Sequence, residues 1–176
     1  MQLDGRFLFT DEVFPMAEQK TNAMRILDRE KIPYQIHTYD HQDGVIDGAH
    51  VAQKLGQDPA RVYKTLVTRS NKNGIFVFVI PVLEELDLKK AARAAGEKSV
   101  EMIHVKEINA LTGYIRGGCS PVGMKKRYPT FFQQEMEALP QVCVSGGRIG
   151  TQMELDPKDL VRVTQGTLAD LIRKDS

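Results

Sequence analysis

Apolar and polar positions in the first third of the chain predict short helices and strands rather than long regular segments. After Thr21, apolar residues recur at helical spacing until Pro33, whose ring disfavours helical geometry at the residue before it. Residues 34–39 alternate instead and are rich in aromatic and β-branched types, which predicts a strand. Asp47 can cap the next short helix and Gly56 can end it. We therefore expect a helix, a strand and a second helix, in that order, in this part of the chain.

Two β-rich runs in the middle of the chain predict a hairpin. The Asp-Pro pair at 58–59 begins a single helical turn, which leads into the strand-like run 63–68. An Asn-Gly pair at 73–74 separates this run from the apolar run 75–80. Such a pair between two β-rich runs is a strong hairpin signal. We therefore expect the two runs to pair with each other.

The rest of the chain continues the alternation of short elements. The pattern predicts helices opened by Asp87, by Val105 and by the Asp-Pro pair at 156–157, a closing helix at 167–172, strands at 100–103, 130–132, 142–144 and 161–164, and glycine-bearing loops at 117–123 and 145–150. The elements do not follow a regular βαβ rhythm, which favours an α+β fold over a doubly wound one. We expect a mixed, largely antiparallel, barrel-like β-sheet with surrounding helices.

Length, composition and charge indicate one soluble domain. The 176 residues can form a core that buries roughly 70% of the surface of the unfolded chain. Residues 1–15 differ from the rest, so we expect an N-terminal extension or leader there and a single domain over 16–176. The 24 basic and 23 acidic residues exclude a strongly cationic protein held on nucleic acid mainly by counterion release. A local basic cluster at 125–127 is still placed to meet a nucleic-acid backbone.

The sequence shows no membrane or export feature. Apolar runs such as 75–83 fall short of the roughly 20 residues of a membrane helix, and acidic residues interrupt the N-terminal apolar positions. We therefore expect a cytoplasmic protein without a membrane partner, whose Cys119 and Cys143 are reduced thiols. The four histidines lack the spacing of a metal site, so we expect neither a metal nor a cofactor.

One lysine lies inside an apolar strand. Lys64 follows Val62 and Tyr63 and precedes Leu66 and Val67. If its side chain were partly buried, its pKa would fall, and the residue could act as a proton donor, an anion ligand or a nucleophile. Alternatively, Lys64 points outward from a half-exposed strand. The spacing by itself leaves both interpretations open.

Two glycine-bearing segments could cradle a ligand. Residues 117–123 combine flexible backbone with a thiol and a hydroxyl, and their N–H groups could stabilise negative charge on a carbonyl oxygen. Residues 145–150 add a hydroxyl and the guanidinium of Arg148, which could hold a phosphate or carboxylate. Each segment could equally be a tight turn. Cys119 could be a nucleophile, although no base is visibly paired with it, and Cys143 is expected in the core.

Six motifs, in their order along the chain, resemble those of a known protein family. They are Lys-Thr-Asn-Ala at 20–23, Ile-His-Thr-Tyr at 36–39, Val-Tyr-Lys-Thr-Leu at 62–66, Leu-Asp-Leu-Lys-Lys at 86–90, the segment 117–126 and Val-Ser-Gly-Gly-Arg at 144–148. Together they resemble the YbaK family of Cys-tRNA(Pro) deacylases, trans-editing domains related to the insertion domain of prolyl-tRNA synthetase. The resemblance runs from about residue 20 to residue 173.

The resemblance implies an enzyme that removes cysteine from Cys-tRNA(Pro). This mischarged tRNA forms because cysteine and proline are close in size, so the synthetase cannot exclude cysteine well enough by binding. The family mechanism uses no metal and no enzyme nucleophile, since the substrate's own thiol attacks its ester carbonyl and a thiolactone leaves. The implied catalytic residues are Lys64, Gly117 and Gly118, and the implied substrate-binding residues are Tyr39, Thr65, Ser120, Pro121, Ser145, Gly146, Gly147 and Arg148. The implied partners are the acceptor end of aminoacyl-tRNA and prolyl-tRNA synthetase.

Two positions depart from the family pattern. Relatives often place an aromatic residue where this chain has Ile46-Asp47, and an acidic residue near Gln152. Both positions bear on substrate packing and selectivity. An editing enzyme for another small aminoacyl group, such as alanyl-tRNA(Pro), is one alternative. A non-catalytic protein of the same fold that binds aminoacyl-tRNA or an amino acid is the other.

Overall fold

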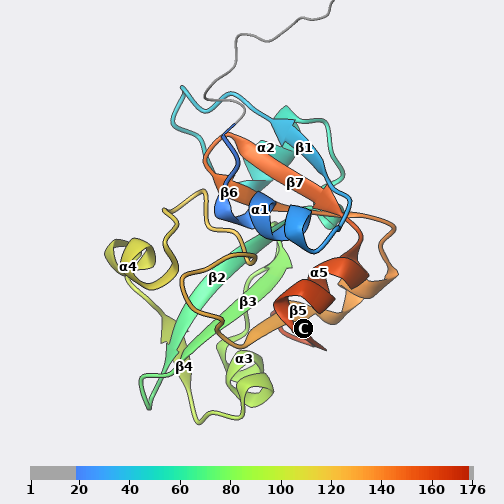
Figure 1. Cartoon of the computed structure of the whole chain (residues 1–176). Coiled ribbons are helices and arrows are strands. Elements are labelled where there is room, and N and C mark those ends of the chain that lie inside the picture. Colours follow the sequence, from blue (N-terminus) through green and yellow to red (C-terminus); the bar gives the residue numbers. More distant parts are fainter. Residues whose placement is uncertain (1–18, 175–176) are drawn as a thin grey trace, which may run out of the picture.

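The computed structural model describes residues 19–174 and contains two β-sheets with helices around them (Figure 1). The expected extension at 1–15 lies outside the described residues. The helices are α1 (Asn22–Arg29), α2 (Gly48–Lys54), α3 (Leu88–Ala95), α4 (Ile108–Thr112) and α5 (Pro157–Thr164), with 3-10 turns η2 (Pro59–Arg61), η3 (Val105–Glu107) and η4 (Gln134–Ala138). The strands are β1 (Gln35–Thr38), β2 (Tyr63–Ser70), β3 (Ile75–Pro81), β4 (Val100–Met102), β5 (Thr130–Gln133), β6 (Val142–Arg148), β7 (Thr151–Leu155) and β8 (Thr167–Ala169).

The strand pairing confirms a mixed, largely antiparallel architecture. One sheet has the order β1-β7-β6 and is antiparallel, while the other has the order β4-β2-β3-β5-β8. Within the second sheet, β5 runs parallel to both β3 and β8, and the other pairs are antiparallel. A single bridge between Val62 and Cys143 joins the two sheets. The barrel is not closed, because one bridge does not continue into a ladder between β6 and β2.

Local signals account for most of the helix boundaries. The side chains of Thr21, Asp47, Asp87 and Asp156 accept hydrogen bonds from the first turns of α1, α2, α3 and α5. Gly96 ends α3 with a φ of 71°, a left-handed conformation that glycine adopts without steric cost. The hairpin of β2 and β3 is also confirmed. None of the described helices is both long and apolar enough to span a bilayer.

Three predictions in the last third of the chain are wrong. Residues 161–164 are the end of α5 rather than a strand, since the helix opened at Asp156 continues for eight residues. Residues 167–172 are not a helix, because 167–169 form β8 beside β5 and Ile172 forms a bridge with Leu86. The expected loop at 145–150 is largely strand, with a bulge in β6. Strand β7 was not predicted, and pairing with other strands decides β6, β7 and β8.

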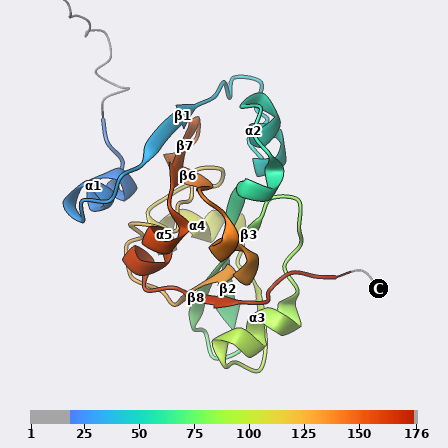
Figure 2. The same ribbon diagram turned by 90° about the vertical axis from the view of Figure 1, so that its right-hand side faces the viewer.

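The central strand β3 has buried residues on both faces, which explains its unbroken apolar sequence. Val77 and Val79 pack in a core cluster with α1, α5 and the β1-β7-β6 sheet, while Phe78 and Ile80 pack in a second cluster beneath α3. The rings of Phe78 and Phe131 stack with their centroids 5.4 Å apart. Figure 2 shows α1 and α2 on opposite sides of the β1-β7-β6 sheet, which leaves the β6 edge facing the start of β2.

Candidate active site

The structure brings five of the predicted site residues to one pocket of about 240 Å³. The pocket lies between the start of β2, the N-terminal half of α2, the segment that follows α4, and strands β6 and β7. The predicted residues that line it are Tyr39, Lys64, Thr65, Gly117 and Ser145. They come from four separate parts of the chain, since Lys64 and Thr65 are adjacent, so only the folded protein assembles them.

Lys64 supplies the half-buried positive charge of the pocket, whose lining also includes the exposed Arg116. It is the second residue of β2, opposite Ile80 of β3, and its side chain is half-buried. Burial lowers the pKa of Lys64, while the negative charges of Glu85, Glu84 and Asp47 act in the opposite direction. Within residues 19–174, no acceptor lies within hydrogen-bond distance of its ammonium group. The sequence left an inward and an outward lysine open, and the structure places Lys64 at the pocket.

Thr65 adds an unused hydroxyl beside Lys64. Its Oγ1 is shielded from solvent and has no hydrogen-bond partner in the described part of the chain. A buried hydroxyl without a partner is costly, so such atoms are often satisfied by a ligand or by water. Because Thr65 lines the pocket, its hydroxyl is available to a bound molecule.

The two glycine-bearing segments pack directly against each other. A Cβ atom on Gly118 would lie 2.8 Å from the Cα of Arg148 and 2.9 Å from the backbone nitrogen of Ile149. Gly117 has a φ of 85°, and a Cβ there would lie 2.7 Å from Cδ1 of Ile46. Glycine is therefore required at both positions, at Gly118 by close backbone approach and at Gly117 by conformation as well.

The backbone N–H groups of this segment differ in availability. The Gly118 N–H donates to the Ile115 carbonyl at 2.9 Å, so the expectation that Gly118 polarises a substrate carbonyl is not supported by its geometry. The N–H groups of Gly117 and Cys119 have no acceptor among residues 19–174, and both residues line the pocket. These two donors, rather than that of Gly118, are free to stabilise an oxyanion.

Six predicted site residues do not line the pocket. They are Gly118, Ser120, Pro121, Gly146, Gly147 and Arg148. Ser120 is fully buried, and its Oγ accepts from the Val122 N–H at 3.2 Å, which is a structural role. The Arg148 guanidinium donates to the Gln19 carbonyl at 2.7 Å and so is already engaged.

The glycine-bearing segment 145–150 is held against the start of α1. Thr21 donates from its hydroxyl to the Gly146 carbonyl at 2.6 Å. A Cβ on Gly147, whose φ is 102°, would lie 2.9 Å from Cβ of Thr21. Ser145 accepts from the Gly147 N–H at 3.2 Å, which supports the bulge. The Ser-Gly-Gly motif therefore positions Ser145 in the pocket, while Gly147 allows the start of α1 to approach and Gly146 allows Thr151 of β7 to do so.

Gln152, which lines the pocket, is paired with a second glutamine, Gln57. The amides of Gln57 and Gln152 exchange hydrogen bonds of 2.7 and 2.9 Å, and Gln152 is buried. Sequence reasoning marked Gln152 only as a departure and missed Gln57. No local signal could have joined two residues that are 95 positions apart.

Replacing Gln152 with leucine is expected to lower the free energy of unfolding by about 1–3 kcal/mol, because the Gln57 amide then loses its partner. Denaturant titration monitored by circular dichroism measures this change. Gln53→Leu, at an exposed position of α2, is the control and is expected to change stability by less than about 0.5 kcal/mol. Equal effects of the two substitutions would contradict a structural role for the pair.

The two cysteines have different surroundings. Cys143 is fully buried, as expected, and burial raises the pKa of its thiol to about 12. Cys119 lines the pocket, and burial raises its pKa to about 11. A raised pKa keeps the Cys119 thiol protonated, whereas a nucleophilic cysteine needs a lowered one. Among residues 19–174, no group of three or more His, Cys, Asp or Glu side chains is arranged to hold a metal ion.

Comparison with known proteins shows the family of the chain. Residues 45–163 match the model of the aminoacyl-tRNA editing domain family. The chain is 46% identical over 158 residues to a protein of Enterococcus faecalis named "Putative Cys-tRNA(Pro)/Cys-tRNA(Cys) deacylase EbsC", covering 90% of this chain and 96% of that protein.

Solved structures share the fold. A crystal structure described as "a putative trans-editing enzyme for prolyl tRNA synthetase" is 24% identical with a TM-score of 0.75, and covers 89% of this chain and all of that one. The crystal structure of "hypothetical protein APE2540" is also 24% identical, with a TM-score of 0.78, and covers 86% of this chain and 99% of that one. The resemblance drawn from the ordered motifs is confirmed, and the chain belongs to the aminoacyl-tRNA editing domain family.

Proposed function

We propose that this protein is an aminoacyl-tRNA deacylase that removes cysteine from Cys-tRNA(Pro). The observation that carries the proposal is its 46% identity, over nearly the whole of both chains, to a relative whose name contains that activity. The pocket supports it, because a volume of about 240 Å³ suits a small aminoacyl group together with part of the terminal nucleotide. Lys64 and the N–H donors of Gly117 and Cys119, which have no acceptor or ion-pair partner in the described part of the chain, lie in the same pocket.

The proposed reaction is cleavage by the substrate's own thiol. The cysteine sulfur attacks the ester carbonyl carbon, a carbon–sulfur bond forms, the ester carbon–oxygen bond breaks, and the thiol proton passes to the ribose oxygen that leaves. The product thiolactone and the free tRNA end balance the reaction without a metal or an oxidant. The protein contributes by holding the thiol close to the carbonyl and by stabilising the oxyanion.

Each pocket residue has a role in this reaction. The N–H groups of Gly117 and Cys119 are the donors to the oxyanion, because no described acceptor occupies them. Lys64 positions the terminal adenosine or the aminoacyl group by its charge, and the hydroxyls of Thr65 and Ser145 supply further hydrogen bonds. Tyr39 lines the same pocket and helps to orient the substrate.

The test is release of labelled amino acid from Cys-tRNA(Pro), with Ala-tRNA(Pro) and Pro-tRNA(Pro) as controls. We expect release of cysteine alone, because alanine and proline have no thiol to attack the ester. Cleavage of the alanyl ester would keep the reaction class but overturn the substrate and the thiol-assisted step. Binding of all three substrates without cleavage would replace the enzyme with a binding protein of the same fold.

Cys119→Ala is expected to keep most of the deacylase activity, because the attacking thiol belongs to the substrate and the Cys119 backbone N–H is retained. Initial rates of cysteine release, compared with the unchanged protein, measure this. A loss as large as that caused by Lys64→Ala would contradict the mechanism and would return Cys119 as a nucleophile.

We further propose that prolyl-tRNA synthetase is the partner, and that both act in the cytoplasm. The name of the E. faecalis relative gives Cys-tRNA(Cys) beside Cys-tRNA(Pro), so the name does not indicate selection of one tRNA by the deacylase itself. A chain with a net charge of +1 has little means of selecting one tRNA body by itself. Adding the synthetase is therefore expected to raise the rate on Cys-tRNA(Pro) relative to Cys-tRNA(Cys), and an unchanged ratio would contradict the partnership.

A further inference from the structure

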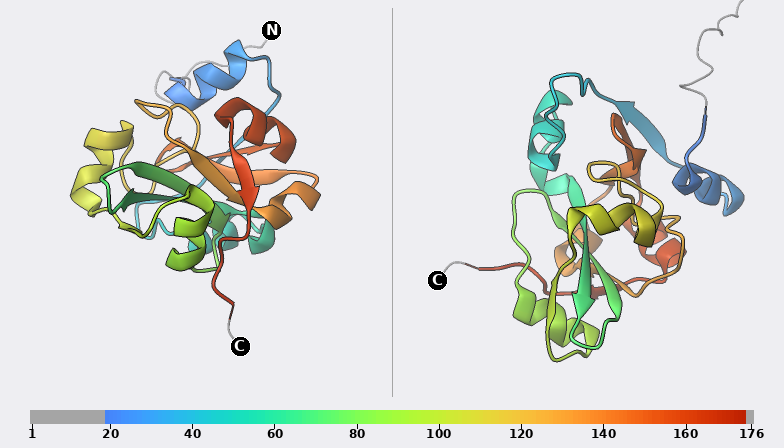
Figure 3. Two further views of the ribbon diagram at one scale, coloured as in Figure 1. Left: turned by 90° about the horizontal axis from the view of Figure 1, so that it is seen from below. Right: turned by 90° about the vertical axis from the view of Figure 1, so that its left-hand side faces the viewer.

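A second and larger hollow of about 480 Å³ lies on the other side of the segment that forms the small pocket. Its walls are one face of α1, residues 121–130 and the C-terminal end of α5. Gly117 and Cys119 line the small pocket, whereas Pro121, Val122 and Gly123 line the large hollow. The right-hand view of Figure 3 shows α2 and α1 on either side of the segment that follows α4.

The large hollow is basic. Its lining includes Arg29, Lys126, Arg127 and Arg162, against the single acidic side chain of Glu30. Arg162 pairs with Asp159 at 2.9 Å. Lys126 and Arg127 are exposed and have no ion-pair partner among residues 19–174. The chain as a whole has a net charge of only +1, so this concentration of positive charge is local.

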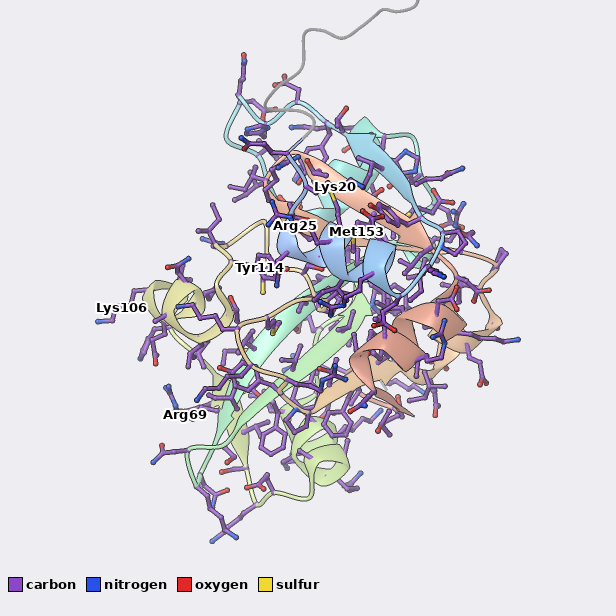
Figure 4. The ribbon with its side chains drawn as sticks, in the orientation of Figure 1. Lys20, Arg25, Arg69, Lys106, Tyr114 and Met153 are labelled. Atoms are coloured by element: carbon purple, nitrogen blue, oxygen red, sulfur yellow. The ribbon has the colours of Figure 1, made fainter. Side chains whose placement is uncertain are left out.

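The backbone that carries these two cations is firmly anchored. The Tyr114 hydroxyl donates to the Val122 carbonyl at 2.6 Å, and the Asn22 amide donates to the Gly123 carbonyl at 2.7 Å. The Tyr128 hydroxyl donates to the Leu111 carbonyl at 2.7 Å. Figure 4 labels Tyr114, whose hydroxyl lies beside the start of α1. Bonds on both sides of the cations therefore hold a preformed site, which lowers the ordering cost of binding.

The neighbouring lysine has a different role. Lys125 donates from its ammonium to the Ala110 carbonyl of α4 at 3.2 Å. It therefore helps to fix the segment against α4, and it does not line the hollow. Of the basic cluster at 125–127, the structure leaves Lys126 and Arg127 for a ligand.

The distance between the two pockets suits one strand of nucleic acid. The chain from Gly117 to Val122 spans at most about 18 Å, since an extended chain advances about 3.3–3.6 Å per residue. Phosphates of one stacked strand recur about every 3.4 Å along the helix axis. A few terminal nucleotides can therefore reach from one pocket to the other.

We propose that the hollow lined by Lys126 and Arg127 binds the sugar–phosphate backbone of the tRNA acceptor end while the aminoacyl group enters the pocket of Lys64. This inference rests on the proposed function for its substrate. Contacts to phosphate position the nucleic acid without reading its sequence, so they orient the ester but do not select the tRNA.

The experiment compares three proteins on two substrates. The proteins are the unchanged chain, Lys126→Ala/Arg127→Ala, and the control Lys72→Ala/Lys98→Ala, which removes two exposed lysines from the hairpin turn and from the loop after α3. The substrates are Cys-tRNA(Pro) and cysteinyl-adenosine, which has the same ester but no phosphate. We measure kcat/KM on both, and the affinity for uncharged tRNA as a function of salt.

We expect the double substitution Lys126→Ala/Arg127→Ala to lower kcat/KM for Cys-tRNA(Pro). We expect it to leave kcat/KM for cysteinyl-adenosine equal to that of the unchanged protein. The slope of log affinity for uncharged tRNA against log salt should become shallower by about 1.4–1.8, the value for two lost phosphate contacts. The control should match the unchanged protein in every measurement. Equal losses on both substrates, or an unchanged salt slope, would overturn the proposal.

Failure of the proposed function gives a different result. In that case the unchanged protein cleaves neither ester, while the binding of uncharged tRNA by the three proteins still decides whether the basic hollow holds a phosphate backbone.

Discussion

Lys64→Met is expected to lower kcat/KM for release of cysteine from Cys-tRNA(Pro) by about 10²–10³-fold, the usual cost of removing one electrostatic group from a preorganised site. The methionine keeps most of the side-chain volume and loses the charge together with the N–H donors of the ammonium group. No described acceptor neutralises the ammonium in the folded protein, so its charge is available to the substrate. Single-turnover rates measure the effect on the chemical step.

The matched control is Lys89→Met, because Lys89 is exposed on α3 and far along the chain from the pocket residues. It is expected to leave the rate unchanged. A rate for Lys64→Met within a few-fold of the unchanged protein would show that positioning in this pocket does not depend on the lysine charge.

The same substitution should not destabilise the fold. Burial lowers the pKa of Lys64 in the folded state, so the folded protein binds its proton less tightly than the unfolded chain does. Between the lowered pKa and the ordinary value of 10.5, the unfolded state therefore holds more protons, and the free energy of unfolding rises with pH. Below that window, the cost of burying the charge is present in full. Removing the charge at pH 7 should keep or raise Tm, which calorimetry measures, and a clear fall in Tm would contradict this assignment.

Gly118→Ala is expected to lower deacylase activity by about 10²-fold, the scale of a misplacement of about 1 Å in an active site. The added Cβ would lie 2.8 Å from the Cα of Arg148, so the two glycine-bearing segments must separate. Gly117, whose N–H is a proposed donor to the oxyanion, moves with its neighbour. Because both contacts are backbone, we also expect a loss of about 1–3 kcal/mol in the free energy of unfolding.

Gly96→Ala separates instability from a distorted pocket. Gly96 has a φ of 71° with no atom within 4 Å of a Cβ placed there, so alanine costs about 1–2 kcal/mol of conformational strain and crowds nothing. Parallel thermal unfolding and cysteine-release assays should show two destabilised proteins, of which only Gly118→Ala is slow. Normal rates for Gly118→Ala would indicate that the contact between the segments does not shape the site.

Local residue chemistry determined much of the fold in advance. Asp87 and Gly96 mark the two ends of α3 by capping, and the Asn-Gly pair at 73–74 marks the turn between β2 and β3. These signals act over a few residues and are readable without tertiary contacts. Lys64 was also identifiable, because a lysine inside an apolar strand is unusual.

The sequence could not decide the segments that depend on distant partners. Residues 167–172 have apolar spacing that fits a helix, but pairing with β5 makes 167–169 a strand. Local periodicity is weak over six residues, and edge pairing in a sheet outweighs it. Strand β7 pairs with β1, which is remote in the sequence. It also pairs with β6, but the register shifts at a bulge, so the expected loop at 145–150 did not indicate a hairpin.

The sequence by itself determined which residues were available for the site, namely a lysine in a strand and two glycine-bearing segments. It also determined the family resemblance, which the comparisons confirm. Only the tertiary structure decided how these residues are used. It placed Ser120 in the interior, bonded Arg148 to Gln19 and occupied the Gly118 N–H. The N–H groups of Gly117 and Cys119 have no acceptor within the described residues. The physical reason is that hydrogen-bond availability depends on which distant groups fold against each donor, and that information is absent from local pattern.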